Sequence, residues 1–151
     1  MQPSYSLFWR WVEKEATSYC VENHISILAY SSLAQGILTG KFGPEHKFEE
    51  GDHRAKNKLF QAENYERVQA ALDRLRPIAD RHQKSLGNLA LAWLIAQPQT
   101  NAIVGARDAE QAADNAKAAE VKLSQEDLKE IDAIGRTVTD RLDDNPVMWN
   151  F

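Results

Sequence analysis

The fold of this chain is decided by residues 28–41, which read Leu28-Ala29-Tyr30-Ser31-Ser32-Leu33-Ala34-Gln35-Gly36-Ile37-Leu38-Thr39-Gly40-Lys41. The start of this stretch ends a short apolar run over residues 25–30, which predicts a strand buried on both faces. The remainder opens a connection rich in glycine, serine and charge that reaches Gln61. Loops of that length are uncommon within compact domains and are often functional. The stretch therefore predicts a buried strand whose carboxyl end leads directly into a functional loop.

Outward from this strand, the sequence alternates helices with one further apolar run. The clearest helix carries an apolar stripe at helical spacing from Tyr65 to Ala79, with Pro77 as a point for a kink or an early end. Ser85 is the expected cap of the next helix, the stretch from Ser124 to Asp127 reads as a capping box, and Gly135 ends the last helix. The predicted elements are helices over 10–23, 63–82, 85–97, 108–119 and 124–135, and a second strand over 101–104.

This alternation favours a parallel α/β layout. Two full strands are evident, and a third begins at Met1. A sheet of two or three parallel strands cannot close, and it leaves an unpaired edge at each side. We therefore expect an incomplete barrel over residues 1–135 and a polar tail over residues 136–151. The apolar end of that tail, residues 147–151, is expected to dock on the body.

Length and composition exclude several classes of protein. The 151 residues are short for a complete (β/α)8 barrel, which needs about 250, but a hydrophobic content of 43% suffices for a packed core. The net charge of −4 argues against a nucleic-acid partner. No apolar run approaches the roughly 20 residues that span a membrane, and no secretory signal is visible. Cys20 is the only cysteine and the histidines show no metal-ligand spacing, so we expect a cytoplasmic protein without a metal site.

Three segments resemble the aldo-keto reductase family, in the family's order. Residues 30–41 are similar to the segment after the seventh strand, whose usual form is Tyr-Ser-Pro-Leu-x-x-Gly-x-Leu-x-Gly-Lys, and Gly51-Asp52-His53-Arg54 continues it. Gly105-Ala106-Arg107, with Gln111 and Asn115, resembles the segment after the eighth strand. Residues 2–7 resemble the end of the sixth strand. The resemblance covers nearly the whole chain and implies an α/β fold that is a partial (β/α)8 TIM barrel, with the C-terminal strands and helices only.

The resemblance also implies NADPH as the cofactor. In such barrels, function lies on the loops after the strands, where all three segments fall. Small residues let backbone N–H groups approach phosphate oxygens, and Arg107 beside a helix start suits the 2′-phosphate of NADPH. In the family, the position of Tyr30 stacks on the nicotinamide. The residues implied to bind the cofactor are Gln2, Tyr30, Ser31, Leu33, Gln35, Gly36, Lys41, Arg54, Gly105, Arg107, Gln111 and Asn115.

The sequence departs from the family pattern in two ways. Ser32 and Val104 stand where proline is usual, so each position loses a fixed φ. The family's catalytic aspartate, tyrosine, lysine and histidine lie on earlier strands, and the resemblance implies none of those roles for a residue here. We therefore expect this chain alone to be inactive in hydride transfer between NADPH and an aldehyde or ketone, with an N-terminal half supplying the chemistry.

A second hypothesis belongs to a different class of function, a non-catalytic half-barrel that acts as a nucleotide-binding or protein-interaction module. Its open sheet edges would pair with an N-terminal half or with a second copy of the chain. The discriminator is the proton donor, because hydride transfer without one keeps a high barrier. An excised piece, a split subunit and a truncated gene product all fit the sequence, and no substrate is implied.

Overall fold

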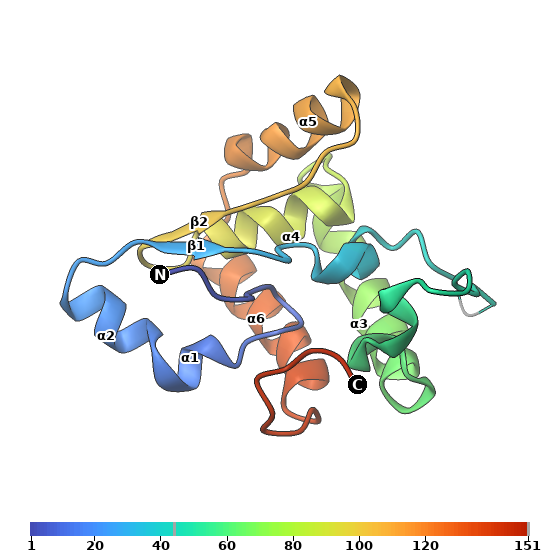
Figure 1. Cartoon of the computed structure of the whole chain (residues 1–151). Coiled ribbons are helices and arrows are strands. Elements are labelled where there is room, and N and C mark those ends of the chain that lie inside the picture. The colour runs from blue at the N-terminus through green and yellow to red at the C-terminus, as the bar shows by residue number, and fades with distance from the viewer. Residues whose placement is uncertain (44, 151) are drawn as a thin grey trace.

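The structure is a computed structural model that describes residues 1–43 and 45–150, and it centres on two parallel strands (Figure 1). β1 (Ile27–Ala29) pairs with β2 (Thr100–Ala102), with Leu28 opposite Asn101. The predicted parallel α/β class is confirmed. Both strands are shorter than the predicted ranges 25–30 and 101–104, because regular pairing is limited to three residues on each strand.

The N-terminal segment lies along the other edge of β1. The carbonyls of Met1 and Pro3 accept the backbone N–H groups of Leu28 (2.8 Å) and Tyr30 (3.0 Å). A parallel bridge joins Ser4 to Tyr30. The segment that begins at Met1 therefore occupies the position of the expected third strand without forming a regular ladder.

Helices surround these strands. Figure 1 shows α4 running alongside the sheet and α5 standing away from the body at the top of the view. The α-helices are α1 (Val12–Glu15), α2 (Thr17–Glu22), α3 (Ala62–Arg81), α4 (Leu86–Ile95), α5 (Ala109–Ala116) and α6 (Gln125–Thr139). The 3-10 helices are η1 (Ala34–Thr39), η2 (His53–Lys56), η3 (Lys58–Phe60) and η4 (Lys117–Glu120).

Three helix predictions are confirmed in detail. α3 follows the apolar stripe, buries Val68, Leu72 and Leu75, and continues past Pro77 without ending. The Ser85 side chain caps α4 by accepting the N–H of Asn88 at 3.1 Å. α6 opens with the predicted capping box. The Ser124 side chain accepts the Asp127 backbone N–H, and the Asp127 side chain accepts the Ser124 backbone N–H. Local signals sufficed at these positions because each cap is made within one turn.

Other predictions are wrong. The helix expected over residues 10–23 breaks at Ala16 into α1 and α2, and the ring of Tyr19 is exposed rather than inward. The helix expected over residues 108–119 is divided into α5 and η4, and the long connection contains η1, η2 and η3. Gly135 does not end α6, which continues to Thr139. β1 is not buried on both faces, because Leu28 is 41% exposed.

The core lies between the sheet and helices α3, α4 and α6. Trp93 of α4 is fully buried and makes an edge-to-face contact with Tyr5, at 6.0 Å between ring centroids. The end of the C-terminal tail docks as expected, because Met148 is buried and its carbonyl accepts the N–H of Lys58 at 2.9 Å. Phe151, the last residue of that prediction, lies outside the described residues. Among the described helices, none has the length and apolar character needed to cross a membrane.

Candidate functional site

A groove of about 730 Å³ opens where the chain leaves β1 and β2. One wall comes from residues 31–41 and the other from residues 103–115. Because parallel strands end at the same edge of a sheet, the loops that follow them are brought together there. Nine of the predicted site residues line this groove, namely Ser31, Leu33, Gln35, Gly36, Lys41, Gly105, Arg107, Gln111 and Asn115.

The first wall is a tight loop with left-handed backbone. Ser31 (φ 53°), Ala34 (φ 48°), Gln35 (φ 59°) and Gly36 (φ 91°) all lie in this region. Such conformations cost a non-glycine residue about 1–3 kcal/mol and persist where surrounding contacts hold them. Hydrogen bonds within the loop help to hold it: the Gln35 Nε2 donates to Ser31 Oγ at 2.8 Å, and the Ala34 N–H donates to the Ser31 carbonyl at 2.7 Å.

The second wall is the turn into α5, which is fixed by side chains of the helix itself. The Gln111 Oε1 accepts the backbone N–H of Arg107 at 3.1 Å, and the Asn115 Nδ2 donates to the Gly105 carbonyl at 3.3 Å. Gln111 and Asn115, one turn apart, therefore support the loop that carries Arg107. Asp108 caps α5 and accepts the backbone N–H of Gln111 at 2.8 Å, so this N–H of the first turn of α5 is already bonded within the chain.

The groove carries charges of both signs. Lys41 and Arg107 contribute the cations, and Asp108, Glu110 and Asp114 contribute carboxylates. Lys117 pairs with Asp114 at 3.1 Å, which offsets one of the negative charges. The acidic residues all lie on or next to α5, whereas Lys41 belongs to the opposite wall. At the end of the groove near α5, the Arg107 cation therefore shares the lining with the carboxylates of Asp108 and Glu110.

Three predicted residues do not line the groove, namely Gln2, Tyr30 and Arg54. Tyr30 immediately precedes the first wall, and its side chain is 38% exposed. Gln2 belongs to the segment that borders β1. It lies between Met1 and Pro3, whose carbonyls accept the N–H groups of Leu28 and Tyr30. Tyr30 and Gln2 are thus neighbours at one side of the groove.

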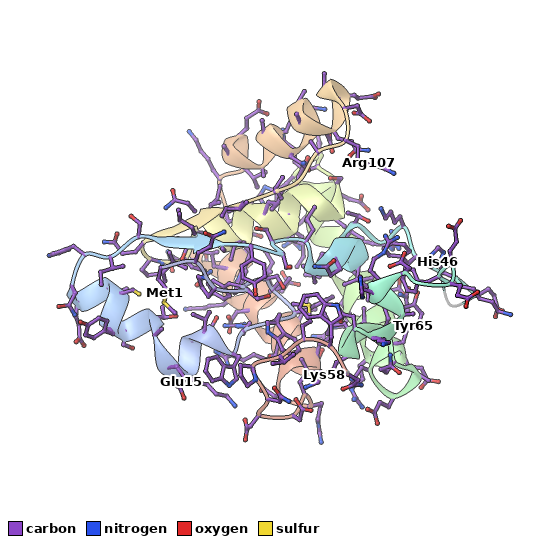
Figure 2. The ribbon with its side chains drawn as sticks, in the orientation of Figure 1. Met1, Glu15, His46, Lys58, Tyr65 and Arg107 are labelled. Atoms are coloured by element: carbon purple, nitrogen blue, oxygen red, sulfur yellow. The ribbon has the colours of Figure 1, made fainter. Side chains whose placement is uncertain are left out.

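Arg54 lies in the long loop, where Asp52 holds it. Its Nε and Nη2 donate to both carboxylate oxygens of Asp52, at 2.5–3.0 Å. Hydrogen bonds from the Arg54 side chain and backbone lower the pKa of Asp52 to about 2. The guanidinium lies over Phe48, 5.0 Å from the ring centroid. Figure 2 shows His46 and Tyr65 at the right of the view, below Arg107.

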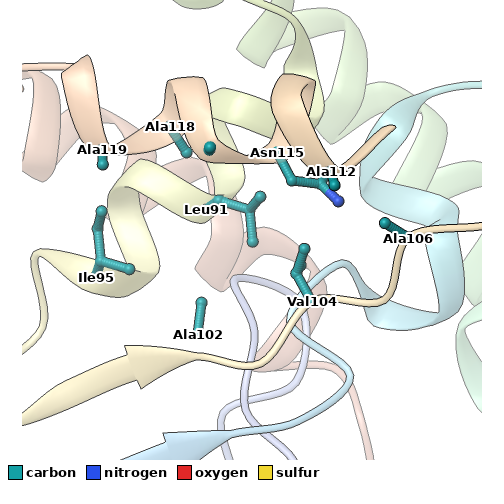
Figure 3. A pocket seen from close by; sticks show the side chains of 10 residues that line it. Leu91, Ile95, Ala102, Val104, Ala106, Ala112, Asn115, Ala118 and Ala119 are labelled. Atoms are coloured by element: carbon teal, nitrogen blue, oxygen red, sulfur yellow. The ribbon is translucent and has the colours of Figure 1, made fainter. Parts of the chain in front are cut away.

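A second, apolar pocket of about 330 Å³ lies between α4, β2 and α5 (Figure 3). Leu91 and Ile95 of α4 face Ala102 and Val104 across it. Val104 and Asn115 line both this pocket and the groove. The pocket lies on the side of β2 away from β1, an edge at which no further strand pairs within residues 1–43 and 45–150.

Sequence reasoning missed several residues that line the groove. Thr39, Asp108, Glu110 and Asp114 were not predicted, although Asp108 has the signature of a helix cap and could have been found from it. Ser32 was noted for the proline it replaces, yet it is buried and bonded within the groove wall. One of its two bonds reaches Ile103, 71 residues away, and no local signal predicts that contact.

Within residues 1–43 and 45–150, no three histidine, cysteine, aspartate or glutamate side chains gather in a way that could hold a metal ion. Cys20 is buried on the inner face of α2, as expected for a small apolar side chain.

The chain resembles known proteins along most of its length. A family model described as "Aldo/keto reductase family" matches residues 1–136. Aldo-keto reductase YhdN of Bacillus subtilis is 35% identical over 136 residues, which cover 89% of this chain and 41% of the relative. The NADH-specific methylglyoxal reductase of Escherichia coli is 35% identical over 128 residues, covering 84% of this chain and 39% of the relative.

A solved structure is also similar. The glycerol dehydrogenase AKR11B4 from Gluconobacter oxydans superposes with a TM-score of 0.86 at 32% identity, over 94% of this chain and 44% of that one. The chain thus spans well under half the length of these relatives.

Proposed function

This chain belongs to the aldo/keto reductase family, and from that premise we propose that its groove binds NADPH as the cofactor-binding part of a reductase. The reaction proposed for the whole enzyme is hydride transfer between NADPH and an aldehyde or ketone. Aldo-keto reductases use nicotinamide cofactors, and the bound nicotinamide supplies the hydride. The chain is proposed to form the C-terminal part of a (β/α)8 barrel, with residues 1–135 in the barrel and residues 136–151 as its tail.

The observation that carries this proposal is the meeting of two distant loops in one groove. Residues 31–41 and 103–115 face each other there and include nine of the residues implied by the family resemblance. A coincidental likeness in either loop would not bring both sets of residues to a single site.

The chemistry of the groove fits a dinucleotide. Lys41 supplies a cation beside a loop of small residues, which is suited to a diphosphate. A Cβ at Gly36 would lie 3.3 Å from the Phe42 ring, and its φ of 91° is one that glycine adopts readily, so this turn of the loop favours a glycine. Arg107 supplies a second cation across the groove, suited to a phosphate on the adenosine ribose. The exposed ring of Tyr30 offers a face for the nicotinamide, and Gln2 an amide for its carboxamide.

The preference for NADPH over NADH is the finer part of the proposal. A guanidinium at Arg107 attracts a 2′-phosphate, whereas the carboxylates of Asp108 and Glu110 repel it and suit a free hydroxyl. We propose that Arg107 prevails because it lies in the turn that Gln111 holds, with its backbone N–H bonded at 3.1 Å. Arg54 would add a contact from the long loop after exchanging part of its bond to Asp52.

The experiment is a titration of the purified chain with NADPH and NADH, followed by nicotinamide fluorescence. We expect NADPH to bind and NADH to bind more weakly. Arg107→Ala should weaken NADPH binding about tenfold or more, the scale of a charge-assisted hydrogen bond, and leave NADH nearly unchanged. Arg74→Ala, an exposed arginine on α3, is the matched control and should change neither value. Absence of binding by the unsubstituted chain would refute the proposal.

A second candidate function is a non-catalytic interaction module, and one observation favours it. Leu28, Tyr30 and Ile103 are 38–42% exposed, and the sheet register places them on one face. Such a face is typical of a surface that another chain covers. Light scattering on the same samples separates the two functions. A dimer that does not bind nucleotide would favour the module, and a monomer that binds NADPH would favour the cofactor-binding part.

No residue of this chain is proposed as the proton donor. We therefore expect the pure 151-residue chain to reduce no aldehyde even when NADPH is bound. Measurable turnover would show that a donor is present and would contradict this part of the proposal.

A further inference from the structure

Ser32 is a polar residue buried inside the wall of the groove. Its side chain is 1% exposed, yet its Oγ lies 2.8 Å from the Ala29 carbonyl and 2.9 Å from the Ile103 carbonyl. A serine hydroxyl has one proton to donate, so the two carbonyls share it or take it in turn. Ala29 is the last residue of β1, and Ile103 is the first residue after β2. The hydroxyl thus joins the ends of both strands.

This link extends the sheet beyond its last regular pair. The Ile103 N–H donates to the Ala29 carbonyl at 2.8 Å, and Ser32 reaches the same carbonyl. Beyond this point the two strands separate into the two walls of the groove. The chain continues from β1 into the wall formed by residues 31–41. From β2 it continues into the turn that carries Arg107.

We propose that Ser32 is a positioning residue, whose buried hydroxyl fixes the distance between the two walls of the groove and holds both in the form that accepts a dinucleotide. Its effect on the cofactor rests on the proposed function. The link itself is made between residues of this chain and can be tested without any cofactor.

The position of Ser32 also supports the strained backbone beside it. Ser31 has a φ of 53°, which persists only where neighbouring contacts hold it. Proline, which the resembling segment usually carries at this position, has no hydroxyl and drives the preceding residue toward an extended conformation. Ser32 therefore permits a conformation of Ser31 that a proline would oppose. This arrangement differs from what the usual form of the segment would give.

The consequence for binding is preorganisation. A ligand that touches both walls must order them if they move independently, and that ordering weakens the observed affinity. Loss of one intramolecular hydrogen bond changes an equilibrium about three- to tenfold. We expect Ser32→Ala to weaken NADPH binding by that factor.

The experiment combines two readouts on the full 151-residue chain. Amide hydrogen exchange without cofactor reports on residues 28–38 and 100–108, and NADPH titration reports the dissociation constant. Ser32→Ala removes the hydroxyl, and Ser32→Thr restores one. Ser124→Ala is the control, because it removes a serine that caps α6 far from the groove.

We expect Ser32→Ala to speed exchange in both loops together, while α3 and α6 keep their protection. Ser32→Thr should return both readouts toward those of the unsubstituted chain. Ser124→Ala should affect α6 and leave the groove loops and NADPH affinity unchanged. In a double-mutant cycle, Ser32→Ala and Arg107→Ala should not be additive, because the first displaces the loop that carries the second.

Three results would overturn the proposal. The first is exchange that rises equally along the whole chain in Ser32→Ala, which would mean a general loss of stability. The second is unchanged exchange in one of the two loops, which would mean that the walls are independent. The third is an unchanged affinity for NADPH in a chain that binds NADPH. If the unsubstituted chain binds no NADPH, the proposed function fails, and the exchange data still decide whether Ser32 joins the walls.

Discussion

Gly135 of α6 lies against Leu7 of the N-terminal segment. A Cβ built on Gly135 would stand 2.6 Å from Leu7 Cδ1 and 3.0 Å from the Leu7 carbonyl oxygen. Real side chains essentially never approach so closely, and the carbonyl belongs to backbone that cannot turn aside. Gly135 is therefore required for the contact between α6 and the segment that borders β1. It does not serve to end the helix.

Gly135→Ala should destabilise the chain, although alanine favours a helix by about 1 kcal/mol over glycine. Overpacking of this kind costs about 1–3 kcal/mol, so we expect a net loss of about 1 kcal/mol or more in the free energy of unfolding in urea. Gly87→Ala in α4 is the matched control, because its nearest contact would be an ordinary 3.7 Å. That substitution should be neutral or stabilising. Equal effects of the two substitutions would contradict the close approach.

The contrast between these glycines marks what the sequence could predict of the fold. The apolar stripe of α3 and the capping box of α6 are made within one helix, and both were predicted correctly. Gly135 and Leu7 are joined only by tertiary packing, so the glycine was misread as a helix end. The exposure of Leu28 was also missed, because an apolar run predicts burial whether or not a covering layer is present.

The candidate site divides in the same way. Motif residues such as Gly36 and Arg107 were named from the sequence, and both line the groove. The link from Ser32 to Ile103 spans 71 residues, and the bond of Gln111 to the Arg107 backbone depends on how the turn enters α5. Spacing gives the positions that could bind, whereas the contacts that hold the walls come from the folded arrangement.

Asp127 should make the free energy of unfolding decrease at low pH. Burial acts to raise the pKa of Asp127, but hydrogen bonds from Ser124, Arg81 and His82 outweigh it and lower the pKa to about 2. In the unfolded chain the group returns toward its ordinary value of 3.8. Because the folded pKa is the lower one, the stabilisation is complete above pH 3.8 and is lost as the pH falls toward 2.

The measurement is urea unfolding at a series of pH values between 5 and 2. Asp127→Asn should be less stable than the unsubstituted chain at pH 5, and its stability should fall less steeply below pH 4. Some slope will remain, because arginine and lysine partners also lower the pKa values of Asp52 and Asp143. Parallel curves for the two proteins would show that Asp127 has no such role.

The docked tail offers a stability test of its own. Met148 is buried, and its carbonyl accepts the N–H of Lys58 in η3. Two residues later, the Asn150 N–H donates to the Lys56 carbonyl at 2.8 Å. Met148→Ala should cost about 2–5 kcal/mol, as other large-to-small changes in a core do. Val147→Ala, at an exposed neighbour, should change the free energy of unfolding by less than about 0.5 kcal/mol. A similar loss for both would mean that the tail is not packed as described.

The exposed sheet face should decide the association of the chain in solution. Leu28 and Ile103 stand on this face beside Tyr30, and no third strand pairs with β2 in the part of the chain that the structure describes. Burying such a face releases about 25 cal/mol for each Å² of apolar surface, which favours contact with a second copy or another protein. We expect the mass from light scattering to rise with concentration. Leu28→Lys should hold the chain at the monomer mass, because a charge cannot be covered without a desolvation cost.

Val21→Lys is the control for this test, because it adds one charge at an exposed apolar residue of α2, outside the sheet face. It should leave the concentration dependence unchanged. Tyr30 is left intact so that NADPH binding can be compared in the same proteins. If the Leu28→Lys variant is monomeric and still binds NADPH, association and cofactor binding are separable. A mass that is monomeric at every concentration before any substitution would remove the interaction module as an explanation of the exposed face.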